Sequence, residues 1–487
     1  MSSPSLPPKA RTILAAAKPL PGKASLLWLL FFKRVCDRRE EERESGGAQP
    51  GGDIPAAHRL IVPAGCAWSE VRRHPAGMGA ALNAALRAVE EANPPVDGLL
   101  SFPDFSDPVS FPPSILAAVL EQLDGIRMRG SDLDDDSFGE IADAVMQEAA
   151  QETGRSKPIP RTPRPVARLL VEMLQPQEGM SIYDGACGSG GILLECCRHL
   201  KRLGRNHESL RFYGQEIEPE SWALCRVSLA CHGIPSDAIE KGDTLRSPRH
   251  LAGDGRALLT FDRVMTHPPF DLGEWGFDEW SPADRYGRSE YGLPPRSSGD
   301  FAFLEHSVSC LNSKGMLGIV APQGVLARSG EEGEIRRRIL QDDLVEAVVT
   351  IGGGILFPSS PPACVLIVNR AKPMERRGKV LLINGDPGTA AGACRGDLSD
   401  EAVDRISAAF RSWKDQEGFC RVVSQAEIER GGAALSVERQ VPAGREGPLH
   451  GVLEEWRTLM KLIEERNEAE RAMAEQIRLL ERGPHDA

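Results

Sequence analysis

The chain has 487 residues, with 58 basic and 70 acidic side chains and a formal net charge of −12 at pH 7. This length exceeds what one hydrophobic core usually supports, which predicts two or three domains. The acidic balance excludes a surface uniformly coated with nucleic-acid-binding charge, although it leaves room for a local basic groove. The 11 cysteines include no Cys-x-x-Cys pair, so neither a disulfide framework nor a metal site is expected. The apolar stretch at 26–32 is too short to cross a bilayer, and we expect a cytoplasmic protein without a membrane segment.

The first part of the chain, residues 1–153, is predicted to be a helical domain. Apolar residues recur there with helical spacing between proline breaks. An acidic group at 132–136 lacks the glycine and the distal glutamate of an EF-hand loop, so it favours the start of a helix over a calcium site. The predicted helices are 25–44, 76–92, 111–123 and 138–152.

From about residue 160, short apolar runs alternate with helical segments. This alternation is typical of an α/β fold in which a parallel sheet is wound with helices, and we assign residues 154–447 to it. The sequence Pro-Ser-Ser-Pro-Pro at 358–362 predicts a hairpin-like excursion late in the sheet. The predicted strands are 181–183, 212–215, 261–266, 315–321, 347–351, 363–369 and 380–383.

Residues 448–487 form the third predicted part, a long polar helix after the break at Gly447-Pro448. Apolar residues recur there at alternating three- and four-residue steps, which is the pattern of a coiled-coil seam. Two interpretations remain open for this helix: it packs on its own chain, or it binds a partner. The seam comprises Val452, Trp456, Leu459, Ile463, Met473, Ile477 and Leu480.

Three strand ends carry glycine or acidic residues that suit a nucleotide-like ligand. Asp184 ends the first strand, and Gly188 and Gly190 lie in the turn before the next helix, where backbone N–H groups can approach a ligand. Glu216 ends the second strand, where a carboxylate can accept hydrogen bonds from ribose hydroxyls, and Asp243 suits an adenine amino group. Tight turns and helix starts use the same residue types, but three such ends in order favour a cofactor site. No Gly-Lys-Ser/Thr follows the glycines, which excludes a Walker loop.

The segment His267-Pro-Pro-Phe270 follows the next strand and predicts a site for a planar amino group. Methylation of such a group requires acceptors for both N–H hydrogens, because these hydrogen bonds draw the lone pair out of the ring. A side-chain acceptor and the carbonyl of the first proline supply them, and the prolines hold the geometry rigid. Phe270 would stack on a base flipped out of a duplex. A nicotinamide dehydrogenase would not explain this segment.

His267 stands where DNA amino-methyltransferases usually carry Asn, Asp or Ser. The ring can accept a hydrogen bond only as neutral imidazole. If His267 is a working acceptor with the ordinary histidine pKa of about 6.5, activity should rise through that pH. Three interpretations are open: a working, pH-sensitive acceptor, an inactive site kept for binding, and an altered choice of substrate.

The ordered motifs resemble the modification subunit of type I restriction–modification systems, a family of N6-adenine DNA methyltransferases. Residues 184–191, Asp-Gly-Ala-Cys-Gly-Ser-Gly-Gly, resemble the family's glycine motif with Gly185 in place of proline. Residues 161–166 resemble its Thr-Pro-Arg segment, with Arg161 in place of an aromatic residue. His267 replaces the family's asparagine. Further similar segments cover nearly the whole chain: 32–35, 213–219, 232–234, 242–245, 291–295, 300–306, 322–326, 333–336 and 362–366.

The resemblance implies a class I S-adenosylmethionine-dependent methyltransferase sheet of the Rossmann-like kind, and it implies a role for each motif residue. His267, Pro268 and Phe270 would form the target-base site, and no metal is implied. The implied partners are double-stranded DNA, a specificity subunit and a motor–nuclease restriction subunit. Alternatives are a non-catalytic subunit, or methylation of cytosine N4 or a protein glutamine. The residues implied to bind S-adenosylmethionine are Thr162, Asp184, Gly188, Gly190, Glu216 and Asp243.

Overall fold

The computed structural model describes most of the chain up to residue 441. The described residues are 8–18, 20, 22–45, 59–73, 77–150, 162–280, 284–356, 360–386, 398–441 and five positions between 456 and 466. The chain divides into two compact units, Met1–Val441 and Pro442–Ala487. The predicted seam at 448–487 lies almost entirely outside the described residues and stays a prediction. None of the helices in the described part is long and apolar enough to span a membrane.

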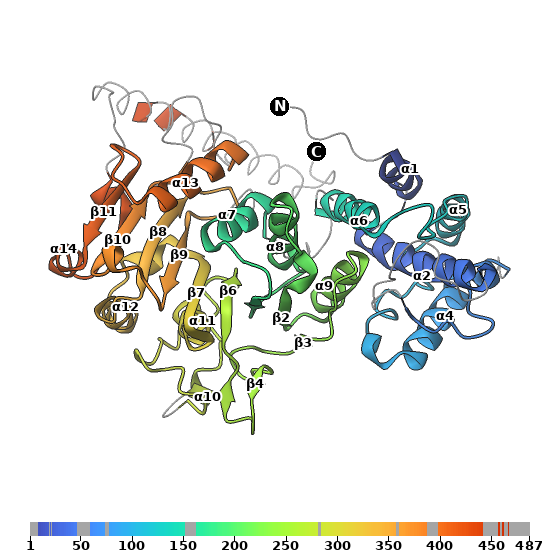
Figure 1. The fold of residues 1–487 in the computed structure, drawn as a ribbon, viewed down its shortest axis with the longest axis horizontal. Coiled ribbons are helices and arrows are strands. Elements are labelled where there is room, and N and C mark those ends of the chain that lie inside the picture. The colour runs from blue at the N-terminus through green and yellow to red at the C-terminus, as the bar shows by residue number, and fades with distance from the viewer. Residues whose placement is uncertain are drawn as a thin grey trace, which may run out of the picture. The chain divides into compact units, whose positions relative to one another are not determined.

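The N-terminal region is helical, as its spacing predicts (Figure 1). Its longest helix, α2, is buried on nearly every side, including the guanidinium of Arg34. The guanidinium donates hydrogen bonds to the carbonyls of Met128 and Leu133 and to the carboxylate of Asp135. Asp135 belongs to the acidic residues at 132–136, so this stretch begins a helix and pairs with a buried arginine of α2. The described residues hold no cluster of three metal-ligating side chains. The helices are α1 Pro8–Ala17, α2 Leu26–Glu44, α3 Trp68–Val71, α4 Met78–Ala92, α5 Pro113–Asp124 and α6 Asp135–Ala150, with 3₁₀ turns at Lys23–Ser25 and Pro94–Val96.

A nine-stranded sheet follows, in the order β11-β10-β8-β9-β7-β6-β1-β2-β3. All seven predicted strands are confirmed, with ends that differ by a few residues at most. The strand β3 ends two residues before Asp243, in agreement with the third predicted strand end, although no range was predicted for it. The strand β11 and the small β4–β5 ribbon were not predicted, because their runs are too short or too polar to stand out. The bounds are β1 Ser181–Asp184, β2 Arg211–Glu216, β3 Ile239–Lys241, β4 Leu251–Ala252, β5 Ala257–Leu258, β6 Phe261–Thr266, β7 Leu311–Pro322, β8 Val345–Ile351, β9 Ala363–Asn369, β10 Lys379–Ile383 and β11 Cys420–Ser424.

The sheet is mixed: it is mostly parallel, with an antiparallel pair where the hairpin-like excursion was predicted. The strands β3, β2, β1, β6 and β7 are parallel neighbours, but β9 runs antiparallel between β7 and β8. The connection from β8 to β9 includes the proline-rich segment, and the two strands pair antiparallel, so the predicted hairpin-like excursion is confirmed. β11 is also antiparallel to β10.

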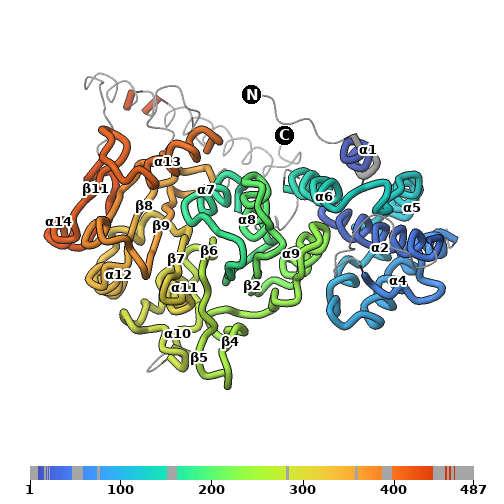
Figure 2. The backbone as a smooth tube through the Cα atoms, in the orientation of Figure 1, coloured from blue at the N-terminus to red at the C-terminus, as the bar shows by residue number. Residues whose placement is uncertain are grey.

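Helices cover both faces of the sheet (Figure 1). The buried apolar side chains form two clusters, one on each face of its central strands. Ile182 and Met265 join one cluster while their neighbours Tyr183 and Val264 join the other, because successive strand residues point to opposite faces. In Figure 2 α7 and α13, far apart in sequence, run side by side, and they are in contact. The helices are α7 Arg164–Leu174, α8 Gly191–Arg202, α9 Pro219–Cys231, α10 Phe277–Trp280, α11 Asp300–Ser309, α12 Glu331–Gln341, α13 Asp400–Ser412, α14 Gln425–Arg430 and α15 Val437–Gln440, with 3₁₀ turns at His207–Ser209, Gln323–Leu326 and Met374–Arg376.

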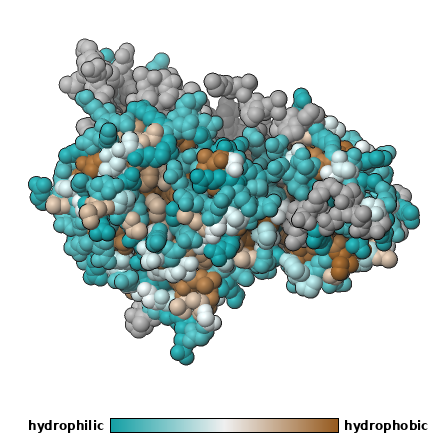
Figure 3. Space-filling view, viewed as in Figure 1, coloured by the Kyte–Doolittle hydropathy of each residue, from teal (hydrophilic) through white to brown (hydrophobic). Residues whose placement is uncertain are grey.

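The N-terminal helices pack on the α/β part through α9, which contacts both α2 and α6. Arg198 of α8 donates to Asp143 of α6 at 3.0 Å, and Arg226 of α9 donates to the carbonyl of Pro95. The division at residue 153 stays a prediction, since both regions belong to one compact unit. The face seen in Figure 3 is mostly hydrophilic, with small scattered apolar groups.

Candidate functional site

The predicted site residues gather where the strand order reverses. The strand β1 pairs with β2 on one side and β6 on the other, so the chain moves outward to β3 and then returns across β1. In α/β sheets such a switch point opens a crevice at the carboxyl ends of the strands. Asp184, Glu216 and His267 come at or just after the carboxyl ends of β1, β2 and β6. Asp184 and His267 are 83 residues apart in sequence, yet both lie at or just after the carboxyl ends of neighbouring strands.

The turn after β1 requires glycine at two positions. Gly188 and Gly190 have φ values of 52° and 82°, a left-handed conformation that other residues avoid. A Cβ on Gly190 would also lie 2.9 Å from the sulfur of Cys225. Gly190 directly precedes α8, so the turn directs backbone N–H groups and the positive end of a helix dipole to the crevice.

Glu216 ties this turn to the second strand. One carboxylate oxygen accepts the N–H of Gly188 at 2.8 Å, and the other accepts the N–H of Glu218 at 2.9 Å. Burial raises the pKa of this carboxyl group above its ordinary value. Each oxygen has a second lone pair, so the carboxylate can still accept hydrogen bonds from two hydroxyl groups.

Asp184 and Asp243 hold local turns. Asp184 is only 1% exposed and accepts the N–H of Ala186 at 3.0 Å, and burial raises its pKa to about 7. One oxygen of Asp243 accepts the N–H groups of Leu245 and Arg246 at 2.9 and 3.0 Å. Both carboxylates therefore organise the backbone around the crevice, a role that the sequence pattern alone did not indicate.

His267 lies just beyond β6 and is half-buried. Its Nδ1 is 3.1 Å from Oγ1 of Thr162, which precedes α7. Burial lowers the pKa of the ring to about 4. A pKa of about 4 favours a neutral imidazole at pH values well below the 6.5 of an ordinary histidine.

Two polar atoms of the segment have no hydrogen-bond partner among the described residues. No described residue makes a hydrogen bond to Nε2 of His267, and none donates to the carbonyl of Pro268. The Phe270 ring is half-buried, with its centroid 5.5 Å from that of His267. The segment thus places an aromatic ring next to two unpartnered polar atoms, and its role as a target-base site stays a prediction. Thr162 was grouped with the cofactor residues, but its hydroxyl contacts the target-base segment.

An arginine that the motifs did not reveal anchors this segment. Asp271 follows Phe270 with a φ of 52°, an uncommon left-handed conformation for a non-glycine residue. Its N–H is donated to Asp300 at 3.0 Å. Arg328 donates to Asp271 at 3.0 Å and to Asp300 at 2.8 Å. The segment 300–306 resembled a family landmark, yet only the structure relates it to the target-base loop.

The excursion after this loop is fixed to the Asp243 turn. Trp280 and Arg288 both donate to the carbonyl of Leu245, at 3.0 and 2.8 Å. The Arg288 guanidinium lies 4.0 Å above the Trp280 ring, where a cation–π interaction adds to the hydrogen bonds. The two halves of the crevice are therefore connected through buried side chains, and no sequence signal beyond the residue types indicates this connection.

Two further residues lie next to the predicted cofactor residues in the chain. Ser189, inside the glycine turn, is 3% exposed, and its hydroxyl has no hydrogen-bond partner among the described residues. Ile217 directly follows Glu216 and is 58% exposed, which is unusual for a large apolar side chain. An unsatisfied buried hydroxyl and an open apolar surface are both suited to a ligand.

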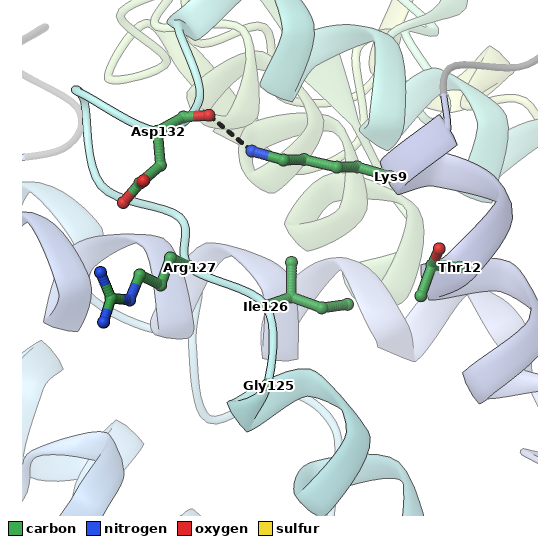
Figure 4. A pocket seen from close by; sticks show the side chains of 6 residues that line it. All are labelled: Lys9, Thr12, Gly125, Ile126, Arg127 and Asp132. Carbon is green, nitrogen blue, oxygen red and sulfur yellow. Dashed lines mark hydrogen bonds between the residues drawn. The ribbon is translucent and has the colours of Figure 1, made fainter.

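A pocket of about 380 Å³ lies elsewhere, in the N-terminal helical region (Figure 4). It is lined by Lys9 and Thr12 of α1 and by residues of the 125–132 segment. Lys9 spans it and donates to the carbonyl of Asp132 at 2.5 Å. None of the predicted site residues lines this pocket.

Two basic segments, 155–168 and 198–211, could each supply phosphate contacts or form a solvated structural face, and the structure describes all of the second one. Its main cations are paired within the chain: Arg198 with Asp143 and Glu195, and Lys201 with Asp136. This pairing favours the alternative of a solvated structural face. Of the other candidate segment, residues 155–161 lie outside the described part of the chain.

Family models match both regions of the chain. The N-6 DNA Methylase model matches residues 133–447, more than half of the chain, and the HsdM N-terminal domain model matches residues 10–123. The chain therefore belongs to the N-6 DNA methylase family. Within that family it is a type I modification subunit, as the match to both models and the relatives below indicate.

Named relatives agree with this assignment. The methylase subunit of the type I restriction enzyme HindI from Haemophilus influenzae is 29% identical over 63% of this chain and 68% of its own length. The MjaVII methylase subunit from Methanocaldococcus jannaschii is 30% identical over 66% of this chain and 56% of its own length. The matches thus span between about half and two thirds of these relatives.

Solved structures show the same fold. A type I restriction–modification methyltransferase subunit from Streptococcus thermophilus superposes with a TM-score of 0.75 at 21% identity, covering 89% of this chain and 99% of that one. A chain from a study of complex assembly in the type I system gives a TM-score of 0.68 at 21% identity, covering 96% and 98%. The expected methyltransferase fold with an N-terminal helical region is confirmed.

Proposed function

We propose that this chain transfers a methyl group from S-adenosylmethionine to the N6 amino group of adenine in duplex DNA. The observation that carries this proposal is the pair of open acceptors, Nε2 of His267 and the carbonyl of Pro268, beside the glycine turn of the sheet. An exocyclic amino group has two hydrogens to donate. Two acceptors at one segment match that group better than a hydroxyl or a carbonyl.

The residues around the glycine turn fit S-adenosylmethionine. The unpartnered hydroxyl of Ser189 and the N–H groups at the start of α8 suit its carboxylate, and the remaining lone pairs of Glu216 suit its ribose hydroxyls. The open side chain of Ile217 offers an apolar surface to its adenine ring. Gly188, Gly190, Asp184 and Asp243 shape the turns around it. When bound, the cofactor supplies an electrophilic methyl group.

His267 acts as a neutral acceptor in this proposal. Because burial lowers its pKa to about 4, the ring carries no positive charge in the physiological pH range. The imidazole accepts one amino hydrogen and the Pro268 carbonyl accepts the other, which concentrates the lone pair on nitrogen. Both acceptors are held before the base arrives, since the proline ring restricts the backbone and Arg328 fixes the loop.

Phe270 provides the surface on which the base stacks. A base can reach the His267 edge only after it leaves the helix stack, so base flipping precedes transfer. Stacking on an aromatic ring contributes about 1–3 kcal/mol per base, which offsets part of the energy of unpairing. The ring of Phe270 is half-buried, so part of its surface is exposed.

We infer that the chain works within a type I complex. Its N-terminal region matches the HsdM N-terminal domain, and its relatives are named methylase subunits of type I restriction enzymes. A separate specificity subunit would select the DNA sequence, and a motor–nuclease subunit would join for cleavage. This division of labour fits a chain whose described basic side chains near α8 are largely paired with carboxylates.

The proposal is tested with labelled S-adenosylmethionine, mixed-sequence duplex DNA and the candidate specificity subunit. The DNA is then hydrolysed and its nucleosides are separated. We expect the label in N6-methyl-2′-deoxyadenosine. Label in N4-methyl-2′-deoxycytidine, or on glutamine in the separately analysed protein fraction, would replace the substrate assignment. Cofactor binding without any transfer would indicate a subunit kept for binding.

A further inference from the structure

The contact between Thr162 and His267 joins two segments that are 105 residues apart in sequence. Thr162 lies immediately before Pro163, the residue that caps the N-terminus of α7. A residue before proline is restricted to extended conformations, so the hydroxyl is presented from a stiff piece of backbone. The contact is the one hydrogen bond that the described residues make to the His267 ring.

The chemistry of neutral imidazole makes this contact consequential. One ring nitrogen carries hydrogen and donates, while the other is bare and accepts. If the Thr162 hydroxyl donates to Nδ1, then Nε2 carries the hydrogen and opposes an incoming N–H group. If Nδ1–H donates to the Thr162 oxygen, then Nε2 is the bare acceptor. Only the second arrangement lets His267 receive a base amino group through Nε2.

We propose that Thr162 is a positioning residue whose oxygen accepts the Nδ1 hydrogen of His267, so that Nε2 faces the target base as a bare acceptor. This inference rests on the proposed function. A hydroxyl suits the role because it can rotate between donating and accepting. Without that oxygen, the Nδ1–H group would be left in a largely buried position with no acceptor among the described residues. Losing this hydrogen bond should shift the equilibrium between the two tautomers away from the Nδ1–H form by roughly 5- to 150-fold.

The role is particular to a histidine acceptor. An asparagine side chain has a fixed carbonyl oxygen and needs no partner to keep it an acceptor. The threonine hydroxyl should therefore matter much more to the natural chain than to a His267→Asn variant. This difference separates tautomer control from a merely structural contribution of Thr162 to the start of α7.

The test combines rates with nuclear magnetic resonance. Thr162→Val removes the hydroxyl at nearly constant shape, and Thr162→Ser keeps it as the matched control. With the specificity subunit and DNA present, we expect Thr162→Val to lower kcat at least tenfold with little change in KM for the cofactor, while Thr162→Ser stays within threefold. In the His267→Asn background the valine substitution should cost less than threefold.

The tautomer is measured separately on the chain labelled with ¹⁵N histidine, so that it does not depend on activity. The expected spectrum of the complex with target DNA shows a protonated Nδ1 and an unprotonated Nε2 at His267 in the natural protein, and a loss of this state in Thr162→Val. A protonated Nε2 in the natural complex overturns the inference even if methyl transfer is observed. Equal losses of rate in both backgrounds overturn it too. If no transfer occurs but the predicted tautomer is seen, the proposed function fails while the positioning role stands.

Discussion

The pH dependence of catalysis distinguishes a buried His267 from an ordinary one. With the ordinary histidine pKa of about 6.5, the neutral fraction of the ring would rise from roughly 9% at pH 5.5 to roughly 91% at pH 7.5, a tenfold change. Burial lowers the pKa of His267 to about 4, so the neutral fraction stays above roughly 95% across the same range. The part of the rate that depends on His267 should therefore be flat.

The assay measures kcat/KM for duplex DNA between pH 5.5 and 7.5, at saturating S-adenosylmethionine. Other groups titrate in this window, among them Asp184 with a pKa of about 7. The His267→Asn variant keeps those groups and lacks the imidazole. The ratio of the natural rate to the variant rate therefore isolates the histidine.

We expect this ratio to change by less than about 1.5-fold across the range, since burial keeps the ring neutral. A tenfold rise of the ratio with a midpoint near 6.5 would show that the ring is solvated and would refute the burial argument. If the variant proves inactive, the His267 ring of the natural protein is titrated by nuclear magnetic resonance. A midpoint near 4 supports the lowering of the pKa by burial, and a midpoint above 6 contradicts it.

Three further substitutions test the architecture of the site. With a pKa of about 7, Asp184 keeps a proton in the folded state that the unfolded chain releases above pH 4, so the free energy of unfolding falls as pH rises from about 4 to 7. In urea unfolding, the natural protein should lose about 2 kcal/mol more of this free energy between pH 5 and 7 than Asp184→Asn does. Gly190→Ala should destabilise the folded protein by roughly 2–4 kcal/mol in thermal unfolding, because the new Cβ combines strain at positive φ with a 2.9 Å contact to the sulfur of Cys225. The control, Gly191→Ala, places its Cβ 3.8 Å from the nearest atom and should cost less than about 1 kcal/mol. Arg328→Gln removes the cation from the buried carboxylates of Asp300 and Glu332, so it should lower the free energy of unfolding by about 2 kcal/mol and also lower kcat. The control, Arg256→Gln, breaks an exposed ion pair and should lower the free energy of unfolding by less than about 0.5 kcal/mol.

Each of these expectations has a clear contrary result. Parallel pH profiles for the natural protein and Asp184→Asn would mean that the carboxyl group is ionised in the folded state. Equal effects of alanine at positions 190 and 191 would remove the case for a required left-handed turn. Unchanged activity in Arg328→Gln would mean that the target-base loop keeps its conformation without this ion pair.

The strand-end motifs could be located from sequence because they combine two independent signals. An apolar run followed by glycine or an acidic residue marks the end of a strand, and the order of such ends along the chain predicts where they meet in a parallel sheet. The strands around Asp184, Glu216 and His267 were predicted in this way, and the structure brings their ends to one switch point. Their roles in binding stay predictions.

The remainder depended on contacts between distant segments. The antiparallel pairing of β9 with β8 agrees with the hairpin predicted from the prolines between them, but the pairing of β9 with β7 depends on tertiary contacts, since a strand has the same pattern in either direction. The contact of Thr162 with His267 and the link from Arg328 to Asp271 join residues with no periodic relation. The pKa of His267 depends on burial, which a residue type alone does not specify.

The decisive measurement for the proposed chemistry is methyl transfer by the natural chain, His267→Ala and His267→Asn, each with the specificity subunit and duplex DNA. We expect the natural chain to form N6-methyladenine and alanine to lower kcat at least a hundredfold with S-adenosylmethionine binding unchanged, because the side-chain acceptor is lost. The proposal would be contradicted if the natural chain were silent while His267→Asn methylated DNA, since histidine would then disable the site, or if alanine left the rate unaltered.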